Sequence, residues 1–402
     1  MNDLSDKNQL QTETARFWWI AIGLSLGPAV TNGLARFAYG LLLPAMRDDL
    51  GWNYTQAGWI NTANAIGYLV GALLALTLIS RLGPVRLFNW GMVLTATALV
   101  FSSISRDFWV LSFWRLLAGI GGAPVFIAGG VLASAIFAED RTRNALVIAL
   151  YYGGGGLGML ATALVLPWFM AWSGNSGWPI AWLMLGLAGL AALLPSWRAA
   201  SLTPRPPAGP TLSLKSGLSV GAMVPALVTY FLFGVGYVIY ITFLIAWMRG
   251  QGAGPGLIAT TWGVMGVAVM FSPFVWRHVL SRAEGGLALS LTSLATGSGV
   301  LLPLLLPGSI SMILSAALFG LAFFMVPTSA TTFVRKNLPA TSWGASIALF
   351  TVVFSIGQIV GPVGAGALTD LSGSTEPGLI AAGLILILGA LLAVMQRPLA
   401  GR

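Results

Sequence analysis

The stretch "RAASLTPRPPAGPTLSLKSGLSVG", residues 198–221, separates two sets of apolar segments in this sequence. Its four prolines and small polar residues are typical of a linker. Six apolar segments precede it and six follow it. Each approaches the ~20 residues that a helix needs to cross a membrane. We therefore predict membrane-spanning helices near residues 17–43, 55–79, 85–105, 108–137, 142–170, 178–197, 222–247, 255–276, 285–306, 308–333, 340–368 and 376–396.

The duplicated pattern predicts an all-α membrane protein of twelve transmembrane helices in two pseudo-symmetric six-helix bundles. Residues 1–197 form the N-terminal bundle, residues 198–221 a cytoplasmic linker and residues 222–402 the C-terminal bundle. The composition agrees, because 57% of the 402 residues are hydrophobic and only 8% are charged. A soluble domain carries roughly 25% charged residues. The first apolar run is about 30 residues long, which exceeds the core of a cleavable signal, about 7–15 residues.

The basic residues are distributed unevenly between the predicted loops. If both termini are cytoplasmic, 15 of the 20 Lys and Arg residues lie on the cytoplasmic side, and only Arg47, Arg106 and Arg249 lie outside. This asymmetry follows the positive-inside rule and predicts a multi-pass protein with both termini in the cytoplasm. The charges hold the orientation in the lipid bilayer and form no stripe for nucleic acid, so we expect no nucleic-acid partner.

The remaining two arginines, Arg36 and Arg115, lie inside predicted spans. Such a charge costs about 2.5–3.5 kcal/mol at the bilayer centre on insertion scales. Counted from the outer ends of their spans, both lie at a depth of about 10–12 Å, at 1.5 Å per residue. Two interpretations are open. The arginines either bond backbone carbonyls and rim aspartates as structural groups, or present their guanidinium groups to an anionic substrate.

Polar and aromatic residues at helical spacing accompany these arginines. The spacing of Asn32, Arg36 and Tyr39 predicts that they share one side of a helix. A mostly apolar pocket with a few oriented polar groups is typical of small-molecule sites, although tyrosines also serve in packing and in interfacial belts. The predicted substrate-binding residues are Asn32, Arg36, Tyr39, Asn61, Asn64, Tyr68, Arg115, Tyr152, Tyr237, Tyr240 and Gln358.

Nothing in the sequence predicts catalysis. Cysteine is absent, His278 is the one histidine, and the spans contain no Ser/His pair, aspartate pair or metal cluster. We therefore predict no enzyme activity, no catalytic residue, no metal site and no cofactor. No acidic residue lies in the middle of a span, which leaves Asp370, near the end of the eleventh, as the candidate proton carrier.

Several motifs resemble those of the major facilitator superfamily. "SRLGPVR" (80–86) resembles its D-R-x-G-R-R element, with Ser80 in place of the aspartate. "RLLAGIGG" (115–122) resembles R-x-x-x-G-x-G, and "GQIVGPVGAG" (357–366) resembles G-x-x-x-G-P-x-x-G. Across nearly the whole chain, "RFAYGLLLPAMRDDLGW", "AGWINTANAIGYLVGALLA" and "SIGQIVGPVGAGALTD" resemble the little-characterised bacterial YbfB/YjiJ-type branch.

This resemblance implies the major facilitator fold and alternating access in a bacterial inner membrane. It implies that the first, fourth, seventh and tenth helices line a central cavity and that the third, sixth, ninth and twelfth face lipid. On the motif residues and the rim acid we predict a second set of residues, which act in coupling or gating: Arg81, Gly83, Arg86, Gly361, Pro362 and Asp370.

The predicted function is secondary active or facilitative transport of a small organic solute that bears a carboxylate. Arg36 and Arg115 would engage its charge, and tyrosines would enclose an apolar or aromatic remainder. The alternatives are a multidrug or aromatic-compound exporter of the same superfamily and a non-transporting membrane sensor. The expected partners are the small-molecule substrate and the lipid bilayer, and a monomer is compatible with this plan.

Overall fold

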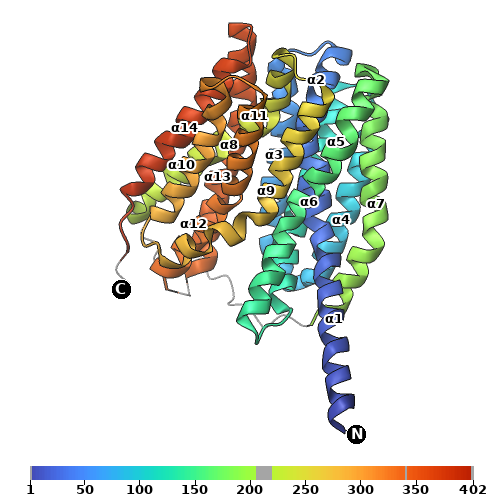
Figure 1. The fold of residues 1–402 in the computed structure, drawn as a ribbon, viewed down its shortest axis with the longest axis vertical. Helices are drawn as coiled ribbons and strands as arrows, with labels where there is room; N and C mark the ends of the chain where they lie inside the picture. The colour runs from blue at the N-terminus through green and yellow to red at the C-terminus, as the bar shows by residue number, and fades with distance from the viewer. Residues whose placement is uncertain (1, 205–219, 340–341, 400–402) are drawn as a thin grey trace.

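The computed structural model describes residues 2–204, 220–339 and 342–399, and these ranges fold as helices joined by short connections. Within these described residues, eleven helices are long and apolar enough to cross a membrane. The long helices run side by side (Figure 1). Their bounds are α3 (Tyr54–Leu82), α4 (Pro84–Phe101), α5 (Phe108–Ala135), α6 (Arg141–Ser173), α7 (Trp178–Leu202), α8 (Val224–Gly250), α9 (Pro255–Arg282), α10 (Leu287–Leu305), α13 (Trp343–Ser372) and α14 (Glu376–Val394). Short 3₁₀ turns, η2 (Asn175–Gly177) and η3 (Val220–Met223), precede α7 and α8.

The first span changes its helical winding part-way along, which the apolar pattern over residues 17–43 does not reveal. It consists of α1 (Asn2–Pro28), a nine-residue π-helix η1 (Ala29–Phe37) and α2 (Ala38–Leu50). Together they cross the bundle from one end to the other and supply the twelfth span (Figure 1). A π-helix has more residues per turn than an α-helix, so residues three apart share one side less closely than the α-helical spacing predicts. Every residue of η1 is buried.

The tenth span also bends. It consists of α11 (Ser309–Phe323) and α12 (Met325–Asn337), which meet at Phe324. Beyond this point α12 turns away from the direction of α11 and lies across the end of the bundle (Figure 1). At the bend, Phe323 stacks on Tyr237 of the second half and lies edge-on to Phe37 of the first half, and the ring of Phe324 packs beside Gly155 of the first half.

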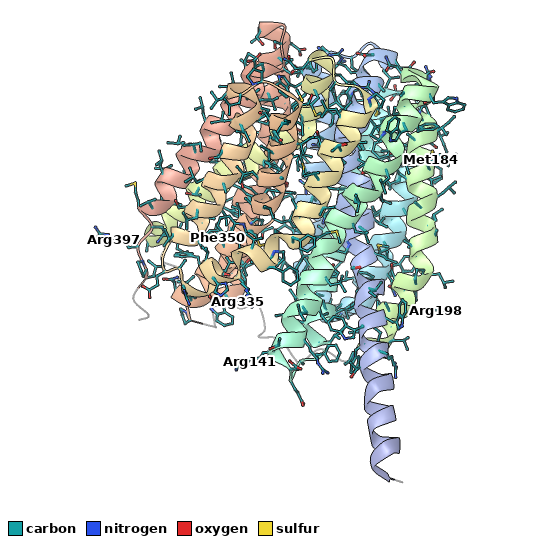
Figure 2. All side chains as sticks on the ribbon, in the orientation of Figure 1. Arg141, Met184, Arg198, Arg335, Phe350 and Arg397 are labelled. Atoms are coloured by element: carbon teal, nitrogen blue, oxygen red, sulfur yellow. The ribbon has the colours of Figure 1, made fainter. Side chains whose placement is uncertain are left out.

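The bundle has two distinct ends. We call the end at which α7 ends and α8 begins the linker end, and the opposite one the far end. Helix α7 continues to Leu202, so residues 198–202 of the predicted linker are helical, and residues 205–219 lie outside the described residues. The labelled side chains of Arg141, Arg198, Arg335 and Arg397 lie toward the linker end (Figure 2).

The two halves meet through backbone-to-backbone contacts at glycines. A Cβ atom added to Gly58 of α3 would lie 2.2 Å from the carbonyl oxygen of Pro362 in α13. Equivalent approaches occur at three more glycines, between the middle of the bundle and the far end. They join Gly40 to Ile241, Gly156 to Gly266 and Gly366 to Tyr54. Small residues allow such close helix approach in lipid, and here they hold the halves together toward the far end.

A side chain at one of these glycines should force the halves apart at the far end. In the Gly58→Val variant, we expect a longer distance between spin labels attached to Ile104→Cys and Ile310→Cys. These exposed residues lie at the far end, one in each half, and the native chain contains no competing cysteine. The measurement is pulsed electron spin resonance on purified protein.

The matched control is Gly364→Val, on α13. A Cβ atom at this helical glycine meets no other atom within 4 Å, so the distance between the labels should not change. An unchanged distance in Gly58→Val would show that this contact does not hold the far end closed.

Candidate functional site

Arg36 lies at the centre of the site, in the last turn of η1, and is only 6% exposed. Its Nη2 atom donates a hydrogen bond of 2.7 Å to Oε1 of Gln358 on α13, so this bond joins the two halves. The guanidinium carbon also lies 4.9 Å from the centre of the Tyr68 ring. Among the described residues, the ion pairs are Arg47–Asp48, Arg106–Asp49 and Arg143–Asp140. Arg36 is therefore a buried cation that contacts an amide and an aromatic ring but pairs with no carboxylate of the described chain.

Gln358 is held by the second half of the protein. Its Nε2 atom donates to the hydroxyl of Tyr237 on α8. Two glycines beside it bring the helices together, because a Cβ atom on Gly357 or Gly361 would lie 2.3 or 2.8 Å from a carbonyl oxygen of α8. The predicted gating residue Gly361 thus lies in the packing that positions Gln358.

A wall of aromatic rings adjoins this hydrogen-bonded group. The ring of Tyr237 stacks nearly parallel on Phe233, Phe354 and Phe323, at centroid distances of 4.9, 5.7 and 5.9 Å. Tyr230 extends the stack, 4.8 Å from Phe354. We call these five residues the aromatic wall. It places flat apolar surface next to the polar groups of Arg36, Gln358 and Tyr237.

Arg115 belongs to a separate cluster inside the first half. It is 1% exposed, donates from Nη1 to the backbone carbonyl of Ala35, and lies against the rings of Trp182 and Tyr39 at 5.0 and 5.3 Å. The hydroxyl of Tyr39 donates to the carbonyl of Ala57 at 2.6 Å. Tyr39 thus contacts Arg115, whereas Arg36 contacts Gln358 and Tyr68, although the α-helical spacing predicts a shared face for Arg36 and Tyr39. This position favours the structural interpretation of Arg115, which holds the backbone of η1.

The other predicted binding residues divide into those between the halves and those within one half. Asn61 donates to Thr242 of α8 at 2.6 Å and so bridges the halves. Within single halves, Asn64 donates to the carbonyl of Arg115, and the hydroxyls of Tyr240 and Ser315 share a 2.6 Å bond. Asn32 is buried in η1 with an amide nitrogen that has no hydrogen-bond partner, and half-buried Tyr152 packs on Phe126 and Tyr151.

The predicted gating residues lie at both ends of the bundle. Arg81 and Arg86 are exposed at the linker end, on either side of Gly83. The φ angle of Gly83 is +78°, a value that glycine adopts readily and other residues rarely adopt. Pro362 lies toward the far end, where its carbonyl contacts Gly58.

Asp370 connects the halves at the far end, a role that the sequence does not show. One carboxylate oxygen accepts a 2.8 Å bond from the amide of Tyr54, and the other accepts bonds of 2.9 and 2.6 Å from the amide and hydroxyl of Thr55. Tyr54 and Thr55 begin α3, so a carboxylate of the second half caps a helix of the first. A negative charge is favourable at a helix N-terminus, where free amides point outward. This geometry fits the predicted gating role better than proton transfer.

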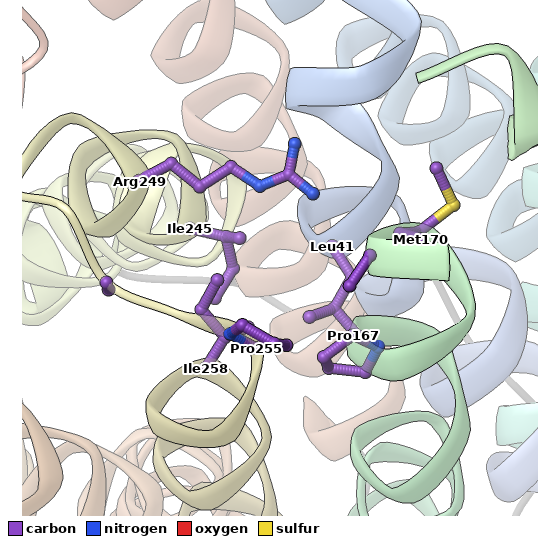
Figure 3. Close-up of a pocket in the computed structure, with 9 residues that line it drawn as sticks. Leu41, Pro167, Met170, Ile245, Arg249, Pro255 and Ile258 are labelled. Carbon is purple, nitrogen blue, oxygen red and sulfur yellow. The ribbon is translucent and has the colours of Figure 1, made fainter. Parts of the chain in front are cut away.

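A small cavity of about 80 Å³ lies between the halves near the far end. Arg249 supplies its charged side chain, which extends from α8 toward α2 (Figure 3). From the sequence, Arg249 is predicted only to lie in an outside loop, because a count of charges does not show where a side chain points. The lining residues are Leu41, Pro167, Met170, Ala171, Ile245, Arg249, Ala253, Pro255 and Ile258.

In the described part of the chain, twelve spans form two six-helix halves with a buried polar centre between them, an arrangement that defines a membrane transporter of the major facilitator class. Residues 28–394 match the family described as "Uncharacterised MFS-type transporter YbfB", and the chain belongs to this family. This membership confirms the predicted resemblance and fold class, and it places the chain among transporters rather than enzymes.

Individual relatives differ in how much of the chain they match. A 3-(3-hydroxy-phenyl)propionate transporter of Escherichia coli K12 is 26% identical, over 91% of this chain and 92% of its own length. A protein of Haemophilus influenzae named as a metabolite transport protein is 32% identical, but the match covers 39% of each chain. The crystal structure of the nucleoside transporter NupG superposes with a TM-score of 0.64 at 13% identity, over 94% of this chain and 97% of that one, which shows the fold alone.

Removal of the Asp370 carboxylate should weaken the far end. We expect Asp370→Ala to lower the free energy of unfolding by about 0.5–2 kcal/mol, the range for loss of a side-chain acceptor at a helix N-terminus, while Asn53 remains as the N-cap of α3. Thermal unfolding in detergent would measure this loss. Glu376→Ala is the control, because it removes an acidic residue from a helix N-terminus at the same end, in the first turn of α14, but no hydrogen bond between the halves, so its loss of stability should be smaller. Equal melting temperatures for the two variants would contradict a capping role.

Proposed function

We propose that this transporter carries small organic anions and that Arg36 binds their carboxylate group. The observation that carries this proposal is the buried guanidinium of Arg36, which hydrogen-bonds to a neutral amide and pairs with no carboxylate of the described residues. A guanidinium and a carboxylate form two parallel, charge-assisted hydrogen bonds that are strong where water is scarce. A substrate anion would supply the counter-charge that the surrounding chain does not.

The surroundings of Arg36 support an anion with an aromatic or apolar remainder. The aromatic wall lies beside Gln358 and Tyr237, and stacked rings favour a flat apolar partner. The E. coli relative that matches most of the chain is named for an aromatic carboxylate, 3-(3-hydroxy-phenyl)propionate. We therefore propose aryl-substituted short-chain carboxylates as the substrate class.

Transport would proceed by alternating access between the two halves. The glycine contacts, the Asn61–Thr242 bond and the Asp370 cap all join the halves between the middle and the far end. The excess of basic residues on the linker side supports a cytoplasmic linker end and a location in the bacterial inner membrane. In this orientation the described arrangement is closed toward the outside.

The energy source follows from the charge of the substrate. All 11 Asp and Glu residues lie outside the middle of the spans, so a buried carboxylate is not available for proton coupling. Inward movement of one negative charge against the membrane potential requires about 2.3 kcal/mol per 100 mV. Exchange for an outgoing anion avoids this requirement, and we propose exchange as the mode of inward transport.

Loss of the Arg36 charge should abolish recognition of the anion. Purified protein in liposomes preloaded with unlabelled 3-phenylpropionate should take up radiolabelled 3-phenylpropionate, and Arg36→Ala should reduce this uptake at least ~30-fold. A lost charged contact in a buried site is worth about 2 kcal/mol or more, and tenfold corresponds to 1.4 kcal/mol. The neutral amide, 3-phenylpropionamide, should not compete with the labelled acid.

The control variant is Arg106→Ala, because Arg106 is an exposed arginine whose removal deletes the same charge far from Gln358. It should transport like the wild type. If Arg36→Ala kept its uptake, or if the neutral amide competed as well as the acid, anion recognition by Arg36 would be refuted. Transport of neutral aromatic compounds independent of Arg36 would instead identify an exporter of such compounds.

A further inference from the structure

The central hydrogen bond between the halves uses the group that would bind substrate. The Nη2 atom of Arg36 donates to Oε1 of Gln358, and both side chains are buried. The side-chain oxygen of glutamine is planar and accepts hydrogen bonds as one oxygen of a carboxylate does. We infer that the Gln358 amide and the substrate carboxylate compete for the same N–H donors of Arg36. This inference rests on the proposed function of Arg36.

The carboxylate is the stronger of the two acceptors. An amide offers one neutral oxygen, whereas a carboxylate offers two oxygens that share a full negative charge and can engage the guanidinium fork with two bonds. In a buried site this difference is large, because little water screens the charges. A carboxylate that takes the Nη2 donor as one of its two bonds to Arg36 therefore displaces the amide.

Gln358 does not follow Arg36 when the bond breaks. Its amide nitrogen is bonded to the Tyr237 hydroxyl, and Gly357 holds α13 against the backbone of α8. The glutamine thus belongs to the second half, whereas Arg36 and the Tyr68 ring beneath it belong to the first. Displacement of the amide removes a bond between the halves.

The Arg36–Gln358 bond belongs to a series of bonds that join the two halves, so its loss weakens the contact between them. The neighbouring bond between the halves runs from the hydroxyl of Thr62 to the carbonyl of Ile359, one residue beyond Gln358, at 2.8 Å. Asn61–Thr242 and the Asp370 cap continue the series toward the far end. The Arg36–Gln358 bond is the member of this series that a carboxylate at Arg36 breaks directly. Gln358 therefore links substrate binding to separation of the halves. Because the substrate carboxylate must displace its amide, Gln358 also lowers the affinity of the protein for the substrate.

Two substitutions at Gln358 should change affinity in opposite directions. Gln358→Leu removes the competing acceptor, so the Kd for 3-phenylpropionate should fall roughly threefold to tenfold, the range that one net hydrogen bond provides. Gln358→Glu places a permanent carboxylate beside Arg36, so the Kd should rise at least ~30-fold through neutralisation and like-charge repulsion. Titration calorimetry on purified protein measures both. A purely structural role for Gln358 would weaken binding in Gln358→Leu rather than tighten it.

The matched control is Thr62→Val, which removes the neighbouring bond between the halves without touching Arg36. Its Kd should stay within about twofold of the wild type, because the carboxylate does not compete for that bond. If Gln358→Leu does not purify as folded protein, Gln358→Asn is one methylene shorter, loses the same bond and should also tighten binding.

The outcomes distinguish this inference from the proposed function. Unchanged or weaker binding by Gln358→Leu, with binding still lost in Arg36→Ala, overturns the competition and leaves anion recognition intact. Wild-type-like binding by Gln358→Glu also overturns it. If the wild-type protein binds 3-phenylpropionate and Arg36→Ala binds it equally well, both proposals fail.

Discussion

A buried positive charge at the contact between two halves is the constraint on which this structure depends. Arg36 lies where a guanidinium group is energetically costly. Two neighbours reduce that cost, because Gln358 accepts a hydrogen bond from Nη2 and the ring of Tyr68 lies against the guanidinium group. Neither neighbour neutralises the charge. The same side chain is thus stable enough to remain in the fold and still attractive to an anion.

The scaffold around Arg36 is built from close backbone approach. Glycines of α13 bring that helix against α8, and glycines of α3, α6 and α2 bring the two halves together. Contacts of this kind need no interlocking of large side chains, and packing is the main source of helix association in lipid. Asp370 adds a directional contact at the far end, where the amides that begin α3 have no partner within their own helix. The arrangement joins the halves firmly at one end through a small set of separable contacts.

The proposed function assigns fold and substrate choice to different parts of this molecule. The chain shares its fold with a nucleoside transporter at 13% identity, and it shares most of its length with a transporter named for an aromatic acid. One helical scaffold therefore carries chemically different solutes, as is general for widely used folds. The distinguishing groups here are Arg36, Gln358 and the aromatic wall, which combine a cation, an amide and stacked rings at one place.

The sequence by itself determined the class of the fold, the division into two halves and the presence of two arginines inside spans. Apolar length and charge asymmetry fix these properties, because the cost of exposing polar backbone or charge to lipid acts on every segment separately. It also identified Arg36, Tyr237 and Gln358 as candidates, though not that they are joined in one chain of hydrogen bonds. Only the tertiary structure separated Arg36 from Arg115, because the packing of the helices brings Arg36 against Gln358 of the second half and Arg115 against the carbonyl of Ala35 and the ring of Trp182 in the first half. It alone brought Asp370 to the start of α3, a contact between residues more than 300 positions apart that no local pattern encodes.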